Sequence, residues 1–396
     1  MAKDQLAGRI SAYFDVTVPD DEIKNIHPSL MMTGNRIVGP EARRKVLSEF
    51  RYDEARIVRY PFKPLDVRWC YLENLRPLFS EPSPQLLNQR FPGNAFFVTR
   101  DTADKDPEGP PFFFAPVVCD YDCISGHARH VPLRLRRRCG ILPLLETQQD
   151  TKEETTANLS PAARAYLASL GLRDPDTDQE TAGLIWYHAL AIGYSPAYLT
   201  ENADGIRQDW PRIPLPNEKD SLLASASLGR QVAALLDTET AVPGVTAGKI
   251  REELKKVAVF QRLDGKPAKP EDGDLDLTAG WGHAGKGGVT MPGKGKIVSG
   301  GAGVSPAYDV FLNGVACWRN MPQDVWNYTI GGYQVIKKWL SYREKPLLGR
   351  GLTPDEVRYV TEMARRLAGV VALHSQLDAN YRQTIAATYV WAGQSA

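Results

Sequence analysis

Clustered basic residues are the side chains of this sequence best suited to chemistry, and the chemistry they suit is the binding of phosphate. Residues 129–138 hold five arginines and no Asp or Glu. Arginine donates paired hydrogen bonds to phosphate oxygens, and alternate residues of a strand share one face. The alternative is a solvated strand face or a set of ion pairs between domains. The five are Arg129, Arg134, Arg136, Arg137 and Arg138.

A second basic segment, residues 280–300, is rich in glycine and holds Lys286, Lys294 and Lys296 without an acidic neighbour. Two stretches in it approach the glycine–lysine spacing of a phosphate loop, but glycine follows each lysine where that loop needs a hydroxyl for magnesium. No helix-forming sequence follows either stretch, which argues against nucleotide hydrolysis. We interpret the segment as a hairpin whose lysines reach a phosphate backbone, with a plain β-hairpin as the alternative.

Two cysteines and two histidines are crowded into twelve residues, at Cys119, Cys123, His127 and His130. Structural zinc sites usually separate two ligand pairs by a longer connector, so that each pair approaches the metal from its own element. We therefore interpret the four as buried cysteines and ordinary histidines, with zinc as the weaker alternative. The chain has five scattered cysteines, an odd number, which indicates reduced thiols and a cytoplasmic location.

Three other places combine basic side chains with aromatic or turn residues. Tyr333 follows two glycines and precedes Lys337 and Lys338; these side chains could touch a nucleic acid, or the segment could serve only helix packing. Arg212 lies between two prolines and could bind a phosphate or a nearby carboxylate. Arg68 stands two residues after an aspartate, with which it could form a local ion pair.

The elements that must position these residues predict an α+β fold: a strand-rich region with helical segments and a C-terminal helical bundle. Ser160-Pro161 and Thr353-Pro354 each read as a helix start, the second as a capping box completed by Glu356. We expect five parts, with residues 146–158 as a charged linker. They are a helical connector (1–50), a strand-rich part (51–145), a linker and helical part (146–260), a β-hairpin-rich segment (261–320) and C-terminal helices (321–396).

The overall composition is that of a globular protein without a basic bias. The 396 residues are 43% hydrophobic and 24% charged, with a net charge of +1, so any nucleic-acid surface must concentrate its positive charge locally. No stretch reads as a signal peptide or is long enough to span a bilayer. We therefore expect no membrane partner.

Four blocks of sequence carry a family resemblance, and they occur in the family's order. They are residues 59–69 (RYPFKPLDVRW), residues 195–214 with Ser195-Pro196-x-Tyr198 and Trp210-Pro211-Arg212-Ile213-Pro214, residues 318–339 with Gly331-Gly332-Tyr333, and the capped helix after Leu352-Thr353. Together they resemble the C-terminal specificity (target recognition) region of type ISP restriction-modification enzymes and related N6-adenine DNA methyltransferases.

The resemblance implies sequence-specific recognition of double-stranded DNA for an adenine-N6 methyltransferase, in a restriction-modification or phage-defence system. The family's catalytic Asp/Asn-Pro-Pro-Tyr/Phe motif is absent from this sequence. We therefore expect no catalysis by this chain alone and no cofactor in it, with S-adenosylmethionine on a partner methyltransferase domain or subunit. The candidate DNA contacts are Arg68, Arg129, Arg134, Arg136, Arg137, Arg138, Arg212, Lys286, Lys294, Lys296, Tyr333, Lys337 and Lys338.

Two alternatives remain open at the level of sequence. The chain could be a protein-interaction subunit that docks a methyltransferase or a helicase without touching DNA. It could also be a DNA methyltransferase with a cryptic cofactor site, which binding of S-adenosylmethionine would reveal.

Overall fold

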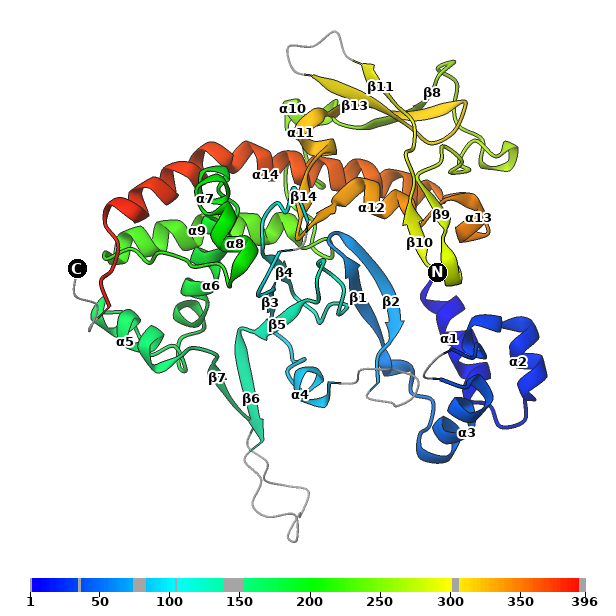
Figure 1. The fold of residues 1–396 in the computed structure, drawn as a ribbon, viewed down its shortest axis with the longest axis horizontal. Coiled ribbons are helices and arrows are strands. Elements are labelled where there is room, and N and C mark those ends of the chain that lie inside the picture. Colours follow the sequence, from blue (N-terminus) through cyan, green and yellow to red (C-terminus); the bar gives the residue numbers. More distant parts are fainter. Residues whose placement is uncertain are drawn as a thin grey trace.

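A computed structural model describes residues 2–34, 37–73, 83–103, 105–138, 153–300 and 306–391. It shows the expected α+β architecture, which combines helices with several small antiparallel sheets. The long helix α14 (Pro354–Ala386) crosses the molecule, with a four-stranded sheet near one end and several helices near the other (Figure 1). None of the helices in these ranges is both long and apolar enough to cross a membrane.

The N-terminal helices form a small unit with its own core of Tyr13, Ile23, Met31 and Val46. The buried Arg43 ties this unit together, because its guanidinium donates to the backbone oxygen of Tyr13 and to the Asp20 carboxylate. The helices are α1 (Lys3–Phe14), α2 (Asp20–Ile26), η1 (Pro28–Leu30), α3 (Gly39–Glu49) and η2 (Glu54–Arg56).

Three small sheets follow. β1 pairs with β2 as a hairpin, β3 lies between β4 and β5, and β6 pairs with β7. These elements are β1 (Ile57–Lys63), β2 (Asp66–Tyr71), α4 (Pro84–Leu87), β3 (Phe96–Thr99), β4 (Phe113–Ala115), β5 (Arg129–Pro132), β6 (Arg134–Arg138) and β7 (Glu153–Ala157).

The expected linker over residues 146–158 is wrong in its second half. Residues 146–152 lie outside the described residues, but residues 153–157 form β7 and pair antiparallel with the arginine strand β6. The register places Glu154 opposite Arg137 and Glu153 opposite Arg138. The arginine segment therefore does have acidic neighbours, which a long-range strand pairing supplies and local sequence could not show.

A helical part covers residues 161–255. Its start is capped as expected, since the Ser160 side chain accepts from the Ala163 amide. The Trp210–Pro214 segment is neither helix nor strand, and it contacts α6 through His188, whose Nε2 is 2.7 Å from the Pro214 oxygen. The helices are α5 (Pro161–Ser169), α6 (Gln179–Gly193), α7 (Pro196–Glu201), α8 (Ala203–Gln208), α9 (Lys219–Leu236) and α10 (Glu252–Lys255).

The four-stranded sheet has the order β11-β12-β13-β8, and a separate ribbon of β9 and β10 extends from it. β8 crosses the boundary expected at residue 260. The elements are β8 (Val259–Arg262), η3 (Pro270–Asp272), β9 (Gly282–Ala284), η4 (Lys286–Gly288), β10 (Thr290–Pro292), β11 (Ile297–Gly300), β12 (Ala307–Phe311) and β13 (Ala316–Pro322).

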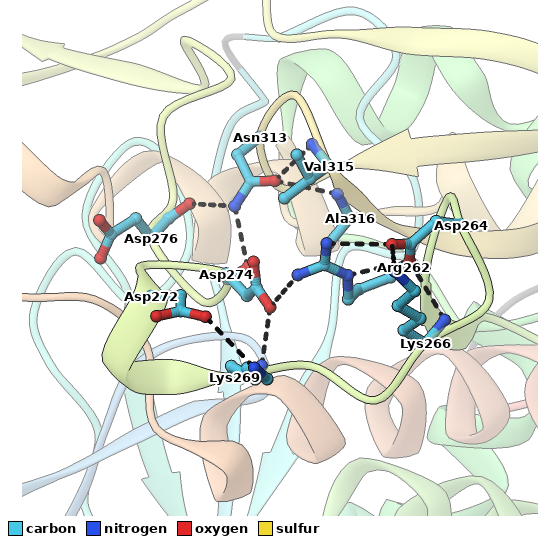
Figure 2. A network of polar contacts seen from close by, with 10 residues as sticks. All are labelled: Arg262, Asp264, Lys266, Lys269, Asp272, Asp274, Asp276, Asn313, Val315 and Ala316. Carbon is cyan, nitrogen blue, oxygen red and sulfur yellow. Dashed lines mark hydrogen bonds and ion pairs between the residues drawn. The ribbon is translucent and has the colours of Figure 1, made fainter.

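The acidic stretch before the β9–β10 ribbon is bound internally (Figure 2). The Arg262 guanidinium bridges Asp264 and the buried Asp274. The Asn313 side chain donates to the backbone oxygens of Asp274 and Asp276, at 2.9 and 3.0 Å. These contacts lock the loop onto the β12–β13 turn, so its carboxylates are largely occupied by neighbouring cations and amides.

The C-terminal part joins the main core, which also takes in side chains of β3, β4, α6, α9 and the four-stranded sheet. The capping box is confirmed, since Thr353 Oγ1 accepts from the Glu356 amide at 3.2 Å and Glu356 accepts from the Thr353 amide at 2.9 Å. The elements before α14 are α11 (Gln323–Trp326), β14 (Thr329–Ile330), β15 (Tyr333–Gln334), α12 (Val335–Ser341) and α13 (Lys345–Leu348).

Candidate nucleic-acid interface

Three of the sequence-predicted contacts meet where the β1–β2 hairpin packs on α12. Arg68 comes from β2, Tyr333 from β15 and Lys338 from α12. Three further side chains complete the group, which we call the cation–aromatic cluster. Its members are Phe62, Lys63, Arg68, Tyr333, Lys338 and Tyr342.

Cations and aromatic rings alternate around this cluster. The Arg68 guanidinium carbon lies 4.0 Å from the Phe62 centroid and 5.0 Å from that of Tyr342. Lys338 Nζ lies 5.0 Å from the centroid of Tyr333 and 4.9 Å from that of Tyr342. Lys63 Nζ completes the ring of contacts, because it lies 4.4 Å from the Phe62 centroid and 5.4 Å from the Tyr333 centroid. All of these separations are within the range of cation–π attraction.

A double-glycine turn positions Tyr333. Gly331 and Gly332 both have positive φ, +52° and +79°, a conformation that glycine adopts without steric cost. A side chain at Gly331 would collide with Ile124, and one at Gly332 with Lys105. The turn is held by the Gly331 amide donating to the Pro110 oxygen at 3.0 Å. The two glycines therefore serve both a positive φ and a close approach of neighbouring side chains.

A buried carboxylate fixes the arginine of the cluster. Asp66 is 1% exposed and accepts from Arg68 Nη2 and from Arg343 Nη2, each at 2.7 Å. The local Asp66–Arg68 pair expected from sequence is thus confirmed, but Arg343 shares it. Burial opposes ionisation of Asp66, yet the charges and hydrogen bonds of Arg343 and Arg68 outweigh burial and hold its pKa below the usual range. One carboxylate therefore serves two guanidiniums, which leaves excess positive charge.

The lysines of the cluster are poorly solvated. Burial lowers the pKa of Lys338, and the nearby positive charges of Lys63 and Lys105 lower it further. Burial also lowers the pKa of Lys63, although Asp120, with Oδ1 3.7 Å from Lys63 Nζ, acts in the opposite direction. An anion placed beside Lys338 would offset both the cost of burying its charge and the repulsion from the other lysines. The cluster is therefore suited to a phosphate group next to a stackable ring.

A cavity of about 690 Å³ opens beside the cluster and shares Arg68 and Tyr342 with it. Arg59 and Trp69 line it from the β1–β2 hairpin, and Tyr359 lines it from α14. The Arg59 guanidinium stacks on Trp69, with its carbon 4.9 Å from the ring centroid, and binds Glu239 at 2.7 Å. Aromatic faces and arginines thus continue from the cluster into a concave surface.

Of the predicted lysines of residues 280–300, Lys286 lies in the turn of the β9–β10 ribbon, and Lys294 and Lys296 lie between β10 and β11. Lys286 and Lys294 are exposed, and Lys296 Nζ lies 4.2 Å from the Phe311 centroid. The lysine at position 286 begins a three-residue 3₁₀ turn, and β11 follows Lys294. Neither lysine precedes an α-helix, in keeping with the rejection of a phosphate loop. Lys337 is half-buried on α12.

The arginine strand lies in a different part of the fold. The Arg134 side chain binds the protein's own backbone, because its Nη2 donates to the oxygens of Thr155 and Asp176, both at 3.1 Å. The Arg136 guanidinium carbon lies 4.8 Å from the Phe91 centroid. Arg129 is exposed, with Nη2 3.8 Å from Asp101. The side chains of Arg137 and Arg138 lie outside the described part. A DNA-binding role for this strand stays a prediction.

Arg212 lies apart from both groups. Its side chain is 89% exposed and pairs with Asp209, three residues earlier, at 3.1 Å. The carboxylate partner weighed from sequence is therefore present, and the guanidinium is also accessible to solvent.

The two cysteines of the candidate metal set adjoin each other, whereas the two histidines have different environments. Cys119 and Cys123 are buried, and burial raises the pKa of the Cys119 thiol. His127 is exposed and lies 3.2 Å from Asp122, whereas burial lowers the pKa of His130 to about 4. Across the described ranges, no three or more His, Cys, Asp or Glu side chains gather as a metal site.

Sequence reasoning missed four residues of this region: Phe62, Lys63, Tyr342 and Arg343. Two of them, Phe62 and Lys63, lie inside the block 59–69 that carries part of the family resemblance. Tyr342 follows Lys338 by four residues, a spacing that places two side chains on one face of a helix. This spacing could have identified Tyr342. Nothing local pointed to Arg343, because its partner Asp66 is 277 residues away.

Comparisons with known proteins agree with this fold. The family described as type ISP C-terminal specificity domain matches residues 35–365. No curated protein sequence matches the chain.

Three solved structures are similar in fold. A nuclease-deletion mutant of the type ISP restriction-modification enzyme LlaGI, in complex with a DNA substrate mimic, has 15% identity and a TM-score of 0.50, over 96% of this chain and 30% of that one. The ATP-dependent type ISP restriction-modification enzyme LlaBIII bound to DNA has 12% identity and a TM-score of 0.53, over 95% and 22%. A DrdV–DNA complex has 17% identity and a TM-score of 0.57, over 95% and 34%. The chain thus spans about a third or less of each.

Proposed function

Because this chain belongs to the family of type ISP C-terminal specificity domains, we propose that it recognises a specific double-stranded DNA sequence for an adenine-N6 DNA methyltransferase. The system would be one of restriction-modification or phage defence, acting in the cytoplasm. The LlaGI and LlaBIII structures with DNA or a DNA mimic support this assignment by analogy of fold. The methyltransferase, with its S-adenosylmethionine, would be a partner domain or subunit.

The observation that carries the proposal is the convergence of Arg68, Tyr333 and Lys338 in one partly buried cluster. These residues come from two separate blocks of the family resemblance, residues 59–69 and 318–339. Arginine and lysine supply phosphate contacts that set the register of a duplex, and aromatic rings supply contact area for sugars or bases. The exposed Lys286 and Lys294 extend the positive surface along the ribbon.

Binding to DNA tests the proposal directly. Duplexes selected by the 396-residue chain from a random 30-base-pair pool would be titrated by fluorescence anisotropy over a range of salt concentrations. We expect tight binding to one sequence class that weakens steeply with salt. Lys338→Ala should reduce the slope of log K against log salt by about 1, as expected for one lost phosphate contact. Tyr333→Ala should weaken binding by about 1–3 kcal/mol if the ring stacks on a base.

Lys24→Ala is the matched control, since Lys24 is an exposed lysine of α2 outside the family match. It should leave both the affinity and the salt slope unchanged. Absence of duplex binding at low salt would refute the proposed function. Binding that survives every cluster substitution would instead refute the assignment of the interface.

The partner is tested separately. Charge reversal of Arg136, Arg137 and Arg138 that abolishes assembly with a methyltransferase but spares DNA affinity would make the arginine strand a protein-docking surface. Micromolar binding of S-adenosylmethionine to the chain, measured by calorimetry, would contradict the expectation that the cofactor belongs to the partner.

A further inference from the structure

The β9–β10 ribbon has an unusual distribution of charge. No Asp or Glu occurs between Asp276 and Asp309, whereas Lys286, Lys294 and Lys296 all fall in that interval. The acidic loop immediately before it is bound internally, as Arg262 and Lys345 pair with Asp274 and Asp276. The ribbon therefore presents positive charge to solvent without an acidic residue of its own.

The end of the ribbon also exposes apolar side chains. Val289 and Met291 are 61% and 45% exposed, on either side of Thr290. Met291 pairs across the ribbon with the exposed His283. The turn between the strands is tight, with the Gly285 amide donating to the Val289 oxygen at 2.7 Å. A narrow, glycine-rich tip thus carries exposed apolar side chains next to Lys286, whereas Lys294 lies at the base of the ribbon.

The base of the ribbon, in contrast, is firmly anchored. Trp281 is 1% exposed; its amide donates to Glu344 at 2.5 Å and its indole Nε1 donates to the Phe311 oxygen at 2.9 Å. Gly295 packs against the face of this indole with φ +68°, so a side chain there would collide with the ring. Because its base is anchored in this way, the ribbon holds its tip in a fixed position relative to the body of the protein.

The ribbon and the cation–aromatic cluster rest on the same helix. Gly282 of β9 packs so closely on the Ser341 carbonyl of α12 that a side chain would not fit. Lys338, on the same helix, and Tyr342, which ends it, belong to the cluster. Figure 1 shows β9 and β10 running beside α12 and away from the four-stranded sheet. A duplex bound at the cluster would therefore lie within the neighbourhood of the ribbon.

We propose that the β9–β10 ribbon is a DNA wedge. On a duplex held at the cluster, Val289 enters a groove and separates the stack at one base step, supported by Met291. Lys286 neutralises a phosphate beside that step, and Lys294, at the base of the ribbon, neutralises a phosphate farther along the duplex. Small apolar side chains inserted between base steps are an established way to kink a duplex. The cost of unstacking depends on the step, so the wedge selects flexible steps without hydrogen bonds to bases. The inference rests on the proposed function.

The acid-free charge pattern favours DNA over a protein surface as the occupant. A methyltransferase domain covering an apolar tip would not require three lysines with no carboxylate within 32 residues of chain. A duplex requires them, because each neutralised phosphate releases a counterion and adds to affinity.

The test uses the full chain and a duplex selected from the random pool, with 2-aminopurine substituted at successive positions. We expect a rise in 2-aminopurine fluorescence at one step on binding. The double variant Val289→Ser/Met291→Ser should abolish that rise and weaken binding by about tenfold, comparable to the loss of one stacking contact, without changing the salt slope. Lys286→Ala/Lys294→Ala should instead reduce the salt slope by about 2.

Val16→Ser is the matched control, because Val16 is a 77% exposed valine in the N-terminal unit; it should preserve both the fluorescence signal and the affinity. Specific binding with no fluorescence change at any step would overturn the wedge and leave the proposed function standing. The same holds if the Val289→Ser/Met291→Ser variant keeps the signal, or loses only assembly with a methyltransferase. Absence of DNA binding by the unaltered chain would overturn both.

Discussion

Replacement of Asp66 by asparagine should damage both the stability of the protein and its binding surface. Asp66 is 1% exposed and lies between two guanidiniums. It accepts from Arg68 Nη2 at 2.7 Å and from Arg343 at 2.7 and 3.2 Å. Asparagine keeps the volume, but it removes the charge and turns an NH₂ group, itself a donor, toward one of the two arginines.

The expected loss is large because of Arg343. Its side chain is only 11% exposed, so Asp66→Asn leaves a mostly buried cation without its counter-charge. Breaking a buried ion pair from one side costs about 3–5 kcal/mol. Arg68 is 36% exposed and can recover hydration, so we assign most of the loss to Arg343. Arg68 would also lose the carboxylate that holds it between Phe62 and Tyr342.

Urea unfolding followed by circular dichroism measures this loss, and anisotropy with the selected duplex measures the effect on binding. Asp355→Asn is the control, since Asp355 is 82% exposed and pairs only locally with Arg358. It should change stability little. A decrease of less than about 1 kcal/mol in the free energy of unfolding for Asp66→Asn would contradict the reasoning, because removing one partner of a buried ion pair destabilises a protein by more than this.

The pH dependence of the same contact has a defined sign. The pKa of Asp66 is lower in the folded protein than in the unfolded chain, so its contribution to stability is complete above about pH 4, the ordinary range of aspartate. The contribution is lost as pH falls further, through the folded pKa. Unfolding curves of the unaltered protein and of Asp66→Asn should therefore converge in strong acid.

Two other substitutions have expected outcomes. Burial lowers the pKa of His188 from 6.5 to about 4, so the unfolded chain takes up the proton first and stability falls as pH drops from about 6.5 to 4, by up to roughly 1.4 kcal/mol per pH unit; His188→Gln should flatten this decline in urea unfolding, and an unchanged slope would contradict it. Thr353→Ala should cost about 1 kcal/mol by removing the N-cap of α14, with Thr353→Ser as a control that keeps the hydroxyl; equal stability of the two variants would refute the role of the cap.

Local features of the sequence predicted much of the secondary structure. Ser160-Pro161 and the Thr353–Glu356 box begin helices as expected, because a cap depends on residues within one turn of each other. The steps of three and four residues also predict a buried stripe of Val357, Val360, Ala364, Leu367 and Val371 on this last helix, since helical periodicity is local. The first four are buried in α14, whereas Val371 is only partly buried. The four sequence blocks likewise indicated the family that matches residues 35–365.

Residues that are neighbours in sequence were a poor guide to which charged side chains lie close together in the folded protein. The arginine segment 129–138 seemed unbalanced, yet β7 places Glu153 and Glu154 opposite it in register. In the acidic loop before the ribbon, Arg262 pairs with Asp274, and Lys345 pairs with Asp276 across 69 residues of sequence. Strand pairing and loop packing decide such partners, because they join residues whose separation in sequence carries no periodic signal.

The sequence by itself therefore determined where helices start, which faces are buried, which family the chain resembles and which side chains can bind phosphate. Only the tertiary structure decided which of those side chains act together. Arg68 meets Tyr342, and Asp66 meets Arg343 across 277 residues, because the β1–β2 hairpin packs on α12. That packing follows from burial of apolar surface, which is non-directional, so no local spacing in the sequence could specify the resulting contacts.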